Sequence, residues 1–178
     1  MKQIITGISL LLALVLAPGC NTTGRLDNQS SIPLAGCYSS STGSQFAFSS
    51  AMQIHGVGAP NDSVLSPSTD AAYRVYLPMR SSADNVSWCL HYTQEGLDDD
   101  LFNDTITFVY TSIPYFASEE CGAMYQYRID ECRYTTHLLD SVIVSDSLIT
   151  NLDLERIKIY FRTQEPDEDT PEPDESEQ

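Results

Sequence analysis

Hydrophobic and polar residues alternate in short runs along the middle of the chain, and no stretch there keeps the 3.6-residue period of an amphipathic helix. Period-two alternation in runs bounded by Gly, Pro, Asn, Asp and Ser is typical of half-buried strands. We therefore expect eight strands separated by polar turns. The runs are "SQFAFSS", "AMQIHGVG", "AAYRVYLPM", "VSWCLHYT", "TITFVYTS", "MYQYRIDECRYTT", "LDSVIVSD" and "ERIKIYFR".

This pattern predicts an all-β fold, an antiparallel sandwich or barrel. Of the two we expect the sandwich, an immunoglobulin-like one of about eight strands over residues 34–162. Such a length suffices for one hydrophobic core. Alternation also assigns side chains to faces. Trp88 shares a face with Val86, Leu90 and Tyr92, so we expect it to anchor the core. In the last run Ile157, Ile159 and Phe161 are expected to point inward, with Arg156, Lys158, Tyr160 and Arg162 outward.

The first twenty residues combine one positive charge with a short apolar run. Lys2 precedes the apolar run "IITGISLLLALVLA", which is shorter than the ~20 apolar residues of a membrane-spanning helix and is typical of a secretory signal. The following "LAPGC" resembles a lipobox, in which the cysteine is acylated. We expect a signal peptide over 1–19, membrane lipid bound through acylated Cys20, and a flexible tether over 20–33; the alternative is ordinary cleavage that leaves Cys20 free.

The residues after Cys20 predict the destination. No Asp follows the cysteine directly, and by resemblance to Gram-negative sorting rules this favours a lipid-anchored protein of the outer membrane. Surface-displayed lipoproteins of some groups carry an acidic cluster at this point, whereas "CNTTGRLDNQ" holds one Asp and one Arg. We therefore expect the domain to face the periplasm.

The last segment, 163–178, contains eight carboxylates, three prolines and no apolar residue after Thr163. Such a composition cannot bury enough apolar surface to offset the entropy of ordering, so it predicts a disordered acidic tail. The formal net charge of the whole chain is -16. A nucleic acid partner requires a basic face, so this charge argues against one.

Four cysteines remain after Cys20, and an even number in an oxidising compartment predicts two disulfides. Nothing between Cys121 and Cys132 turns the chain back, so one continuous strand would hold them about 36 Å apart, far beyond the ~7 Å that a disulfide tolerates. By alternation Cys89 and Cys132 both lie on polar faces, which favours a bridge between them and leaves Cys37 to pair with Cys121. A bulge at "IDEC" would reverse the parity of Cys132.

The order of several motifs resembles a family of small Gram-negative lipoproteins with a domain of unknown function. The motifs are "IHGVGAPNDSVLSP", "YRVYLPM", "DTITFVYTSIPYFASEECGAMYQY", "LDSVIVSDSLITN" and "RIKIYF", and the resemblance covers residues 34–162. Its most specific element is "SEECG", with Cys121 and Gly122 at matching positions, whereas Cys89 and Cys132 lie outside the pattern. The resemblance implies an envelope β-domain and brings no catalytic residues with it.

Three ligand or modification sites are suggested by residue type. Asp98, Asp99, Asp100 and Asp104 crowd one inter-strand loop and suit Ca²⁺, which prefers oxygen ligands; a solvated turn is the alternative. Outward-facing Tyr76 and Tyr160 could stack on sugar rings. Four Asp-Ser/Thr-apolar triplets resemble the O-glycosylation signal of the same bacterial group, at Ser63, Thr105, Ser141 and Ser147.

No catalytic constellation is present in the sequence: neither G-x-S-x-G nor H-E-x-x-H occurs. We therefore expect a non-catalytic, membrane-anchored envelope lipoprotein without a cofactor, which docks on an envelope protein through a recognition scaffold. The alternative is a calcium- or glycan-binding β-sandwich at the cell envelope.

Overall fold

The computed structural model describes residues 31–45, 47, 52–58, 64–66, 72–118 and 122–163. The predictions for Cys20, Ser63 and Cys121 fall outside these residues, as do the signal peptide, most of the tether and nearly all of the acidic tail. Among the described residues, no helix is long and apolar enough to span a membrane.

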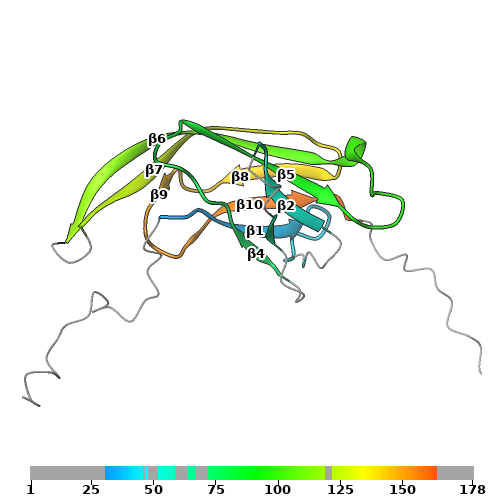
Figure 1. The fold of residues 1–178 in the computed structure, drawn as a ribbon. Helices are drawn as coiled ribbons and strands as arrows, with labels where there is room; N and C mark the ends of the chain where they lie inside the picture. The colour runs from blue at the N-terminus through cyan, green and yellow to red at the C-terminus, as the bar shows by residue number, and fades with distance from the viewer. Residues whose placement is uncertain are drawn as a thin grey trace, which may run out of the picture.

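The described chain is built almost wholly from strands, which Figure 1 labels in order. One short 3-10 helix, η2 (Asp100–Phe102), interrupts them. The strands are β1 (Leu34–Ser39), β2 (Met52–Gly56), β3 (Val64–Ser66), β4 (Arg74–Tyr76), β5 (Asn85–Tyr92), β6 (Asp104–Ser118), β7 (Gly122–Tyr134), β8 (Leu139–Val144), β9 (Leu148–Ile149) and β10 (Glu155–Phe161).

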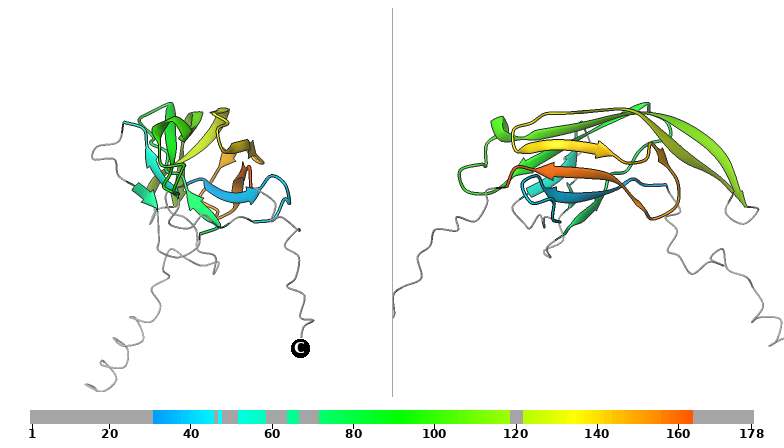
Figure 2. Two further views of the ribbon diagram at one scale, coloured as in Figure 1. Left: turned by 90° about the vertical axis from the view of Figure 1, so that its right-hand side faces the viewer. Right: turned by 180° about the vertical axis from the view of Figure 1, so that it is seen from behind.

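These strands form two sheets, with the orders β4-β1-β10-β8 and β3-β2-β5-β6-β7-β9. Buried side chains of both sheets meet in one hydrophobic core, and Figure 2 shows the two layers from the end and from behind. The predicted all-β sandwich is confirmed. One pairing departs from the antiparallel prediction, because β1 and β10 run parallel, with Cys37 beside Ile159.

The core contains the residues that alternation assigned to it. Trp88 is 6% exposed and packs among Val86, Leu90 and Tyr92, so its predicted role as an anchor is confirmed. Ile157, Ile159 and Phe161 are buried as expected. Where a strand has one solvent-exposed face and pairs regularly, alternation with a period of two correctly predicts which side chains point into the core.

Three strands were not predicted from the pattern, namely β1, β3 and β9. The two shortest, β3 and β9, have three and two residues, too few for alternation to be recognised. In β1 four consecutive residues, 34–37, are buried, so the run does not alternate. Of the predicted run "SQFAFSS", Gln45 forms an isolated bridge with Tyr38, and most of the remainder lies outside the described residues.

The two ends of the sandwich differ in character. β6 and β7 project past the other strands at one end, where β1 and β10 also begin (Figure 1). The opposite end carries η2 and the carboxylates around it, together with the end of β10. The described chain therefore starts near the projecting hairpin and finishes near the acidic end.

Candidate functional site

The projecting part of β6 and β7 is the most distinctive surface of the molecule, and we call residues 112–118 and 122–127 the arm. Its strands pair with each other from Ser112 opposite Tyr127 to Ser118 opposite Gly122. The pairing of β5 with β6 stops at Val109, and β9 reaches only Tyr127 and Arg128 of β7. Most of the arm is thus a two-stranded ribbon without described neighbours.

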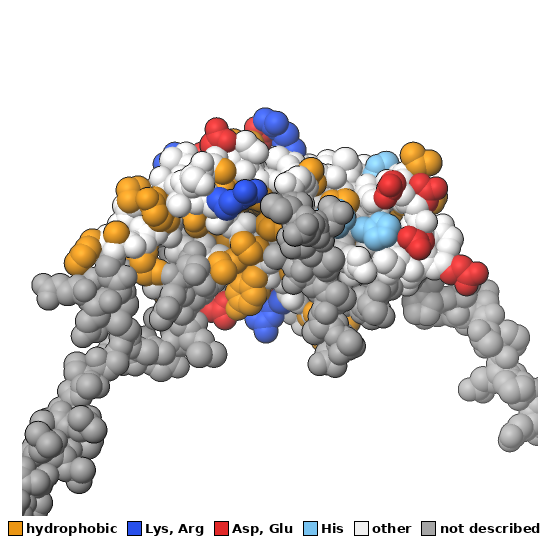
Figure 3. Space-filling model, viewed as in Figure 1, with side chains coloured by type: hydrophobic (Ala, Val, Ile, Leu, Met, Phe, Trp, Pro, Cys, Tyr) orange, Lys and Arg blue, Asp and Glu red, His pale blue; other side chains and the backbone are white. Residues whose placement is uncertain are grey.

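The described side chains of the arm are mostly apolar or aromatic, and neither "SIPYF" (112–116) nor "AMYQY" (123–127) contains a charged residue. Phe116 is 68% exposed and Tyr125 is 42% exposed. Directly paired residues share a face, so Phe116 with Ala123 and Pro114 with Tyr125 continue the face that buries Tyr127 nearer the core. Orange side chains at the arm end are visible in Figure 3.

Two tyrosines fix the root of the arm to the sandwich. The rings of Tyr110 and Tyr127 meet edge to face, with centroids 5.4 Å apart. The Tyr110 hydroxyl donates to the Arg80 carbonyl at 2.9 Å and accepts from the Arg80 N–H at 3.0 Å. The Tyr127 hydroxyl donates a longer bond, 3.5 Å, to the carbonyl of Met79. The chain segment before β5 is therefore held against the root of the arm.

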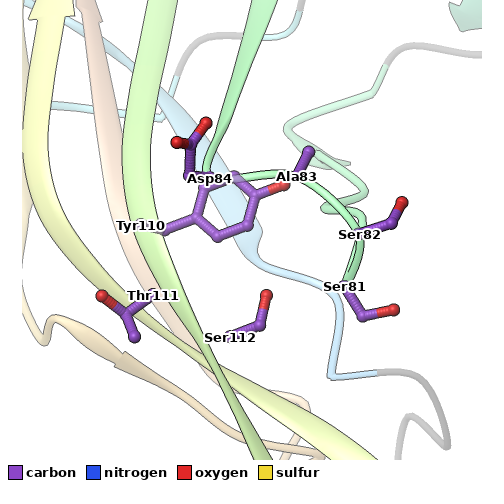
Figure 4. Close-up of a pocket in the computed structure, with 7 residues that line it drawn as sticks. All are labelled: Ser81, Ser82, Ala83, Asp84, Tyr110, Thr111 and Ser112. Atoms are coloured by element: carbon purple, nitrogen blue, oxygen red, sulfur yellow. The ribbon is translucent and has the colours of Figure 1, made fainter.

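A shallow, open pocket of about 490 Å³ lies at this root. Figure 4 shows Tyr110 and Ser112 of β6 facing the segment that precedes β5, and the lining residues are Ser81, Ser82, Ala83, Asp84, Tyr110, Thr111 and Ser112. The Ser112 hydroxyl is buried without a hydrogen-bond partner among the described residues. Buried polar atoms are normally paired, so this hydroxyl is an exception among the polar groups of the pocket lining.

The predicted calcium cluster is not formed. Asp104 is fully buried, and its carboxylate accepts hydrogen bonds of 2.7–2.9 Å from the backbone or hydroxyl groups of Tyr92, Thr135, His137, Leu138 and Leu139. Burial opposes its ionisation, but the hydrogen bonds outweigh burial and hold the pKa of Asp104 below its ordinary 3.8. These hydrogen bonds connect β6 to the β7–β8 connection, and they leave neither carboxylate oxygen free to bind a metal ion.

The remaining aspartates of that loop have local partners instead. Asp98 lies 3.3 Å from Nε2 of His91, and Asp99 caps η2 by accepting from the Leu101 N–H at 2.9 Å. Asp100 accepts from the Asn103 side-chain amide at 3.0 Å. Among the residues described, no three His, Cys, Asp or Glu side chains are grouped as ligands for a metal ion. The alternative interpretation, a solvated turn, describes this loop.

The predicted disulfide between Cys89 and Cys132 is wrong, because both are free thiols on opposite faces of the six-stranded sheet. Val109 pairs with Glu131 and Tyr110 with Ile129, so Asp130 is an extra residue in β7. This bulge reverses the alternation and places Cys132 opposite the buried Phe108, against the core. Cys89 lies beside Thr105 on the other face.

Cys37 is likewise a free thiol, fully buried in the core, and its predicted partner Cys121 lies outside the described residues. Burial is the main cause that raises the pKa of Cys37 to about 12 and that of Cys132 to about 11. Burial also raises the pKa of Cys89. The continuous strand predicted before Cys132 is confirmed, since β7 runs unbroken from Gly122 to Tyr134.

Tyr76 and Tyr160 both lie on the outer face of the four-stranded sheet, as predicted, but on strands separated by β1. The ring of Tyr160 packs at a tilt against the ring of Tyr38, with the two centroids 5.5 Å apart. Tyr38 was not among the predicted site residues. The hydroxyl of Tyr38 donates to Glu155 at 2.5 Å, and that of Tyr76 donates to Asp153 at 2.7 Å. These bonds are the largest cause of the raised pKa of each of the two phenols.

The described candidates for O-glycosylation differ in access. Ser147 is exposed in the turn between β8 and β9, whereas Thr105 and Ser141 are half-buried within strands. Attachment of a glycan requires room for the modifying enzyme, and Ser147 has the most room of these three.

Comparison with known proteins identifies the family. A family model described as a family of unknown function (DUF6452) matches residues 51–161. The chain belongs to this family. The match extends from just before β2 to the end of β10 and includes the whole arm. No curated protein and no solved structure matches the chain. The resemblance to an uncharacterised domain is thus confirmed for most of the folded chain.

Proposed function

We propose that this member of the DUF6452 family is a non-catalytic lipoprotein of the outer membrane that docks on a partner protein of the cell envelope through its arm. One observation carries the docking role. The arm projects from the sandwich with uncharged strands, and it exposes 68% of Phe116 and 42% of Tyr125. Exposed apolar surface is costly to maintain in water, and it marks interaction sites when it is gathered in one place.

The alternatives have weaker support. The aspartates of the 98–104 loop do not converge, and Asp104 is saturated with hydrogen bonds. On the four-stranded sheet, where the glycan site was predicted, the hydroxyls of Tyr38 and Tyr76 already donate hydrogen bonds to carboxylates. A protein partner, in contrast, would remove from water the apolar side chains that the fold leaves exposed on the arm.

The membrane anchor rests on the sequence "LAPGC" and on where the fold begins. Ten residues lie between Cys20 and Ser31, the first described residue, so the chain spans eleven steps and an acylated Cys20 would lie within roughly 40 Å of the sandwich. The chain enters the fold at the arm end, while the carboxylates around η2 lie at the other end (Figure 1). This polarity favours an arm near the membrane surface, while the proposed periplasm-facing orientation rests on the residues after Cys20, which lack an acidic cluster.

Site-specific photocrosslinking in cells tests the docking role. A photoreactive phenylalanine analogue at Phe116 should give one discrete adduct, and the same analogue at Leu101 is the matched control. Leu101 is 76% exposed but lies at the acidic end. Tyr125→Ser should weaken the Phe116 adduct. Equal adducts at both positions, or none at Phe116, would refute docking through the arm.

Labelling with radioactive palmitate tests the anchor separately. The wild-type chain should incorporate label, and the Cys20→Ala variant should not. Equal incorporation by both chains would refute acylation at Cys20 and would leave the docking experiment interpretable.

A further inference from the structure

The two edges of the arm differ in their backbone chemistry. Along β6, the N–H of Tyr110 points away from β7 and donates to the Asp84 carbonyl at 2.8 Å. Backbone direction alternates with a period of two in a strand, so residues 112, 114 and 116 also direct their backbone groups to this edge. Residue 114 is a proline and has no N–H to offer. The β6 edge is therefore interrupted at its centre.

The β7 edge lacks such an interruption over its described length. The N–H of Ile129 points away from β6 and donates to the Ser147 carbonyl at 2.8 Å, and β7 pairs regularly with β6 from Ala123 to Ile129. The same alternation directs the N–H and C=O groups of Ala123 and Tyr125 outward. No described strand covers them, because β9 pairs only with Tyr127 and Arg128.

We propose that residues 123–126 of β7 accept an extended segment of the partner protein as an added strand, which lies beside β7 where the pairing with β9 stops. This inference rests on the proposed docking function and specifies its mode. Strand addition satisfies exposed backbone groups at a sheet edge, while side chains of alternate residues confer specificity. The arm supplies both elements, an open edge and an apolar face formed by Pro114, Phe116 and Tyr125.

The chemistry of the chain restricts the added segment. Every second residue of that segment would lie on the face of Phe116 and Tyr125, so apolar side chains are expected there. The chain carries a net charge of -16, so a segment without net negative charge is favoured. The same charge opposes pairing of two copies through this edge, since both would be strongly negative.

A peptide selection provides the probe. The full chain, purified in detergent, is screened against a phage-displayed library of linear ten-residue peptides. Selected peptides should alternate apolar and polar residues, lack a central proline, and carry neutral or positive charge. Hydrogen exchange resolved to single residues should show new protection of the Ala123 and Tyr125 amides when the synthetic peptide is added.

One matched pair of variants isolates the backbone contribution. Ala123→Pro removes an N–H that faces the open edge and should weaken peptide binding about tenfold. Ala123→Ser keeps the N–H and should bind within about twofold of wild type. In the peptide, N-methylation of one alternate set of residues should abolish binding, and methylation of the intervening set should not.

Several results would overturn strand addition. These are equal binding by Ala123→Pro and wild type, equal tolerance of both methylation patterns, protection elsewhere than at Ala123 and Tyr125, or failure to select any peptide. Formation of dimers that protect the same two amides would assign the edge to a second copy instead. A Phe116 crosslink that keeps its full yield in Ala123→Pro would retain arm docking and reject strand addition, whereas equal crosslinking at Phe116 and Leu101 would reject both.

Discussion

Pro114 and Tyr125 lie directly opposite each other across the arm, and their backbone groups point to opposite edges of it. The proline costs the hairpin no hydrogen bond, because its missing N–H would have faced away from β7. Tyr125, in contrast, keeps its outward N–H and C=O. Proline at a strand edge is a known protection against uncontrolled pairing. The arm thus has one protected edge and one open edge.

Replacing this proline should make the protein self-associate. Pro114→Thr restores a donor to the β6 edge, so we expect a larger fraction of dimers or higher oligomers in sedimentation velocity at several concentrations, in salt high enough to screen the repulsion between two negatively charged copies. The free energy of unfolding should fall by only about 0.5 kcal/mol, through greater freedom of the unfolded chain. Ile113→Thr is the control, since its N–H faces β7. Equal association of both variants would contradict the assignment of edges.

Asp104 should be among the most sensitive positions of the fold. Its two oxygens accept five hydrogen bonds, from Tyr92, Thr135 and three consecutive backbone N–H groups beginning at His137. Asp104→Asn replaces one oxygen with a donor that faces other donors, so the free energy of unfolding should fall by about 3 kcal/mol. Tyr92→Phe removes a single donor and should cost about 1 kcal/mol. Urea denaturation measures both, and similar losses would contradict the network.

The same carboxylate predicts a dependence on pH. The folded-state pKa of Asp104 lies below its ordinary 3.8, so the unfolded chain takes up the proton at higher pH than the folded one does. The stabilisation is therefore complete above about pH 5 and is lost as pH falls through 3.8 toward the lower folded pKa. Urea midpoints from pH 6 to 2.5 should fall more steeply for wild type than for Asp104→Asn. Parallel curves would contradict this linkage.

Local alternation predicted the faces of β5 and β10 but failed at one point in β7. The extra residue Asp130 lets Glu131 and Ile129 pair with successive residues of β6, and every side chain after it changes face. Nothing in "RIDEC" requires this bulge, because it depends on the register with β6. The error in the Cys89–Cys132 pairing follows from this single residue.

The candidate site was only partly visible in the sequence. The predicted run "TITFVYTS" ends at Ser112, so residues 113–118 of the arm were not predicted as strand. The projection of the arm depends on how far β5 and β9 reach, which is a property of the assembled sheet. Pro114, two residues after that run, was the available signal for an edge. The predicted calcium site in the 98–104 loop failed for a related reason. Closeness in sequence does not reveal that the Asp104 carboxylate accepts hydrogen bonds from the backbone of residues 137–139.

The three thiols that the structure describes should react in a defined order. At pH 8 an aromatic disulfide reagent should modify Cys89 first, then Cys132, whose pKa burial raises to about 11. Cys37, fully buried with a pKa of about 12, should react only when the protein unfolds. In a Cys121→Ser background, Cys89→Ser should remove the fast phase alone. Recovery of a Cys89–Cys132 peptide under non-reducing conditions would contradict the positions of these residues on opposite faces.

Removal of one hydroxyl should loosen the root of the arm. The Tyr110 hydroxyl both donates to and accepts from the backbone of Arg80, at 2.9 and 3.0 Å. Tyr110→Phe abolishes both bonds while keeping the ring, so the free energy of unfolding should fall by about 1–2 kcal/mol. Because these bonds hold the segment before β5, amide exchange should accelerate first at residues 80–84, while β5 and β6 keep their protection.

Tyr127→Phe is the matched control for this change, since the Tyr127 ring meets that of Tyr110 edge to face. Its hydroxyl makes one hydrogen bond, to Met79, at the longer distance of 3.5 Å. A bond of that length contributes less, so the loss should be smaller than for Tyr110→Phe and the segment 80–84 should keep its exchange rate. Comparable losses of unfolding free energy in both variants would show that the two hydroxyls support the root equally. The hydrogen bonds of Tyr110 would then not be the main contacts that hold the segment before β5.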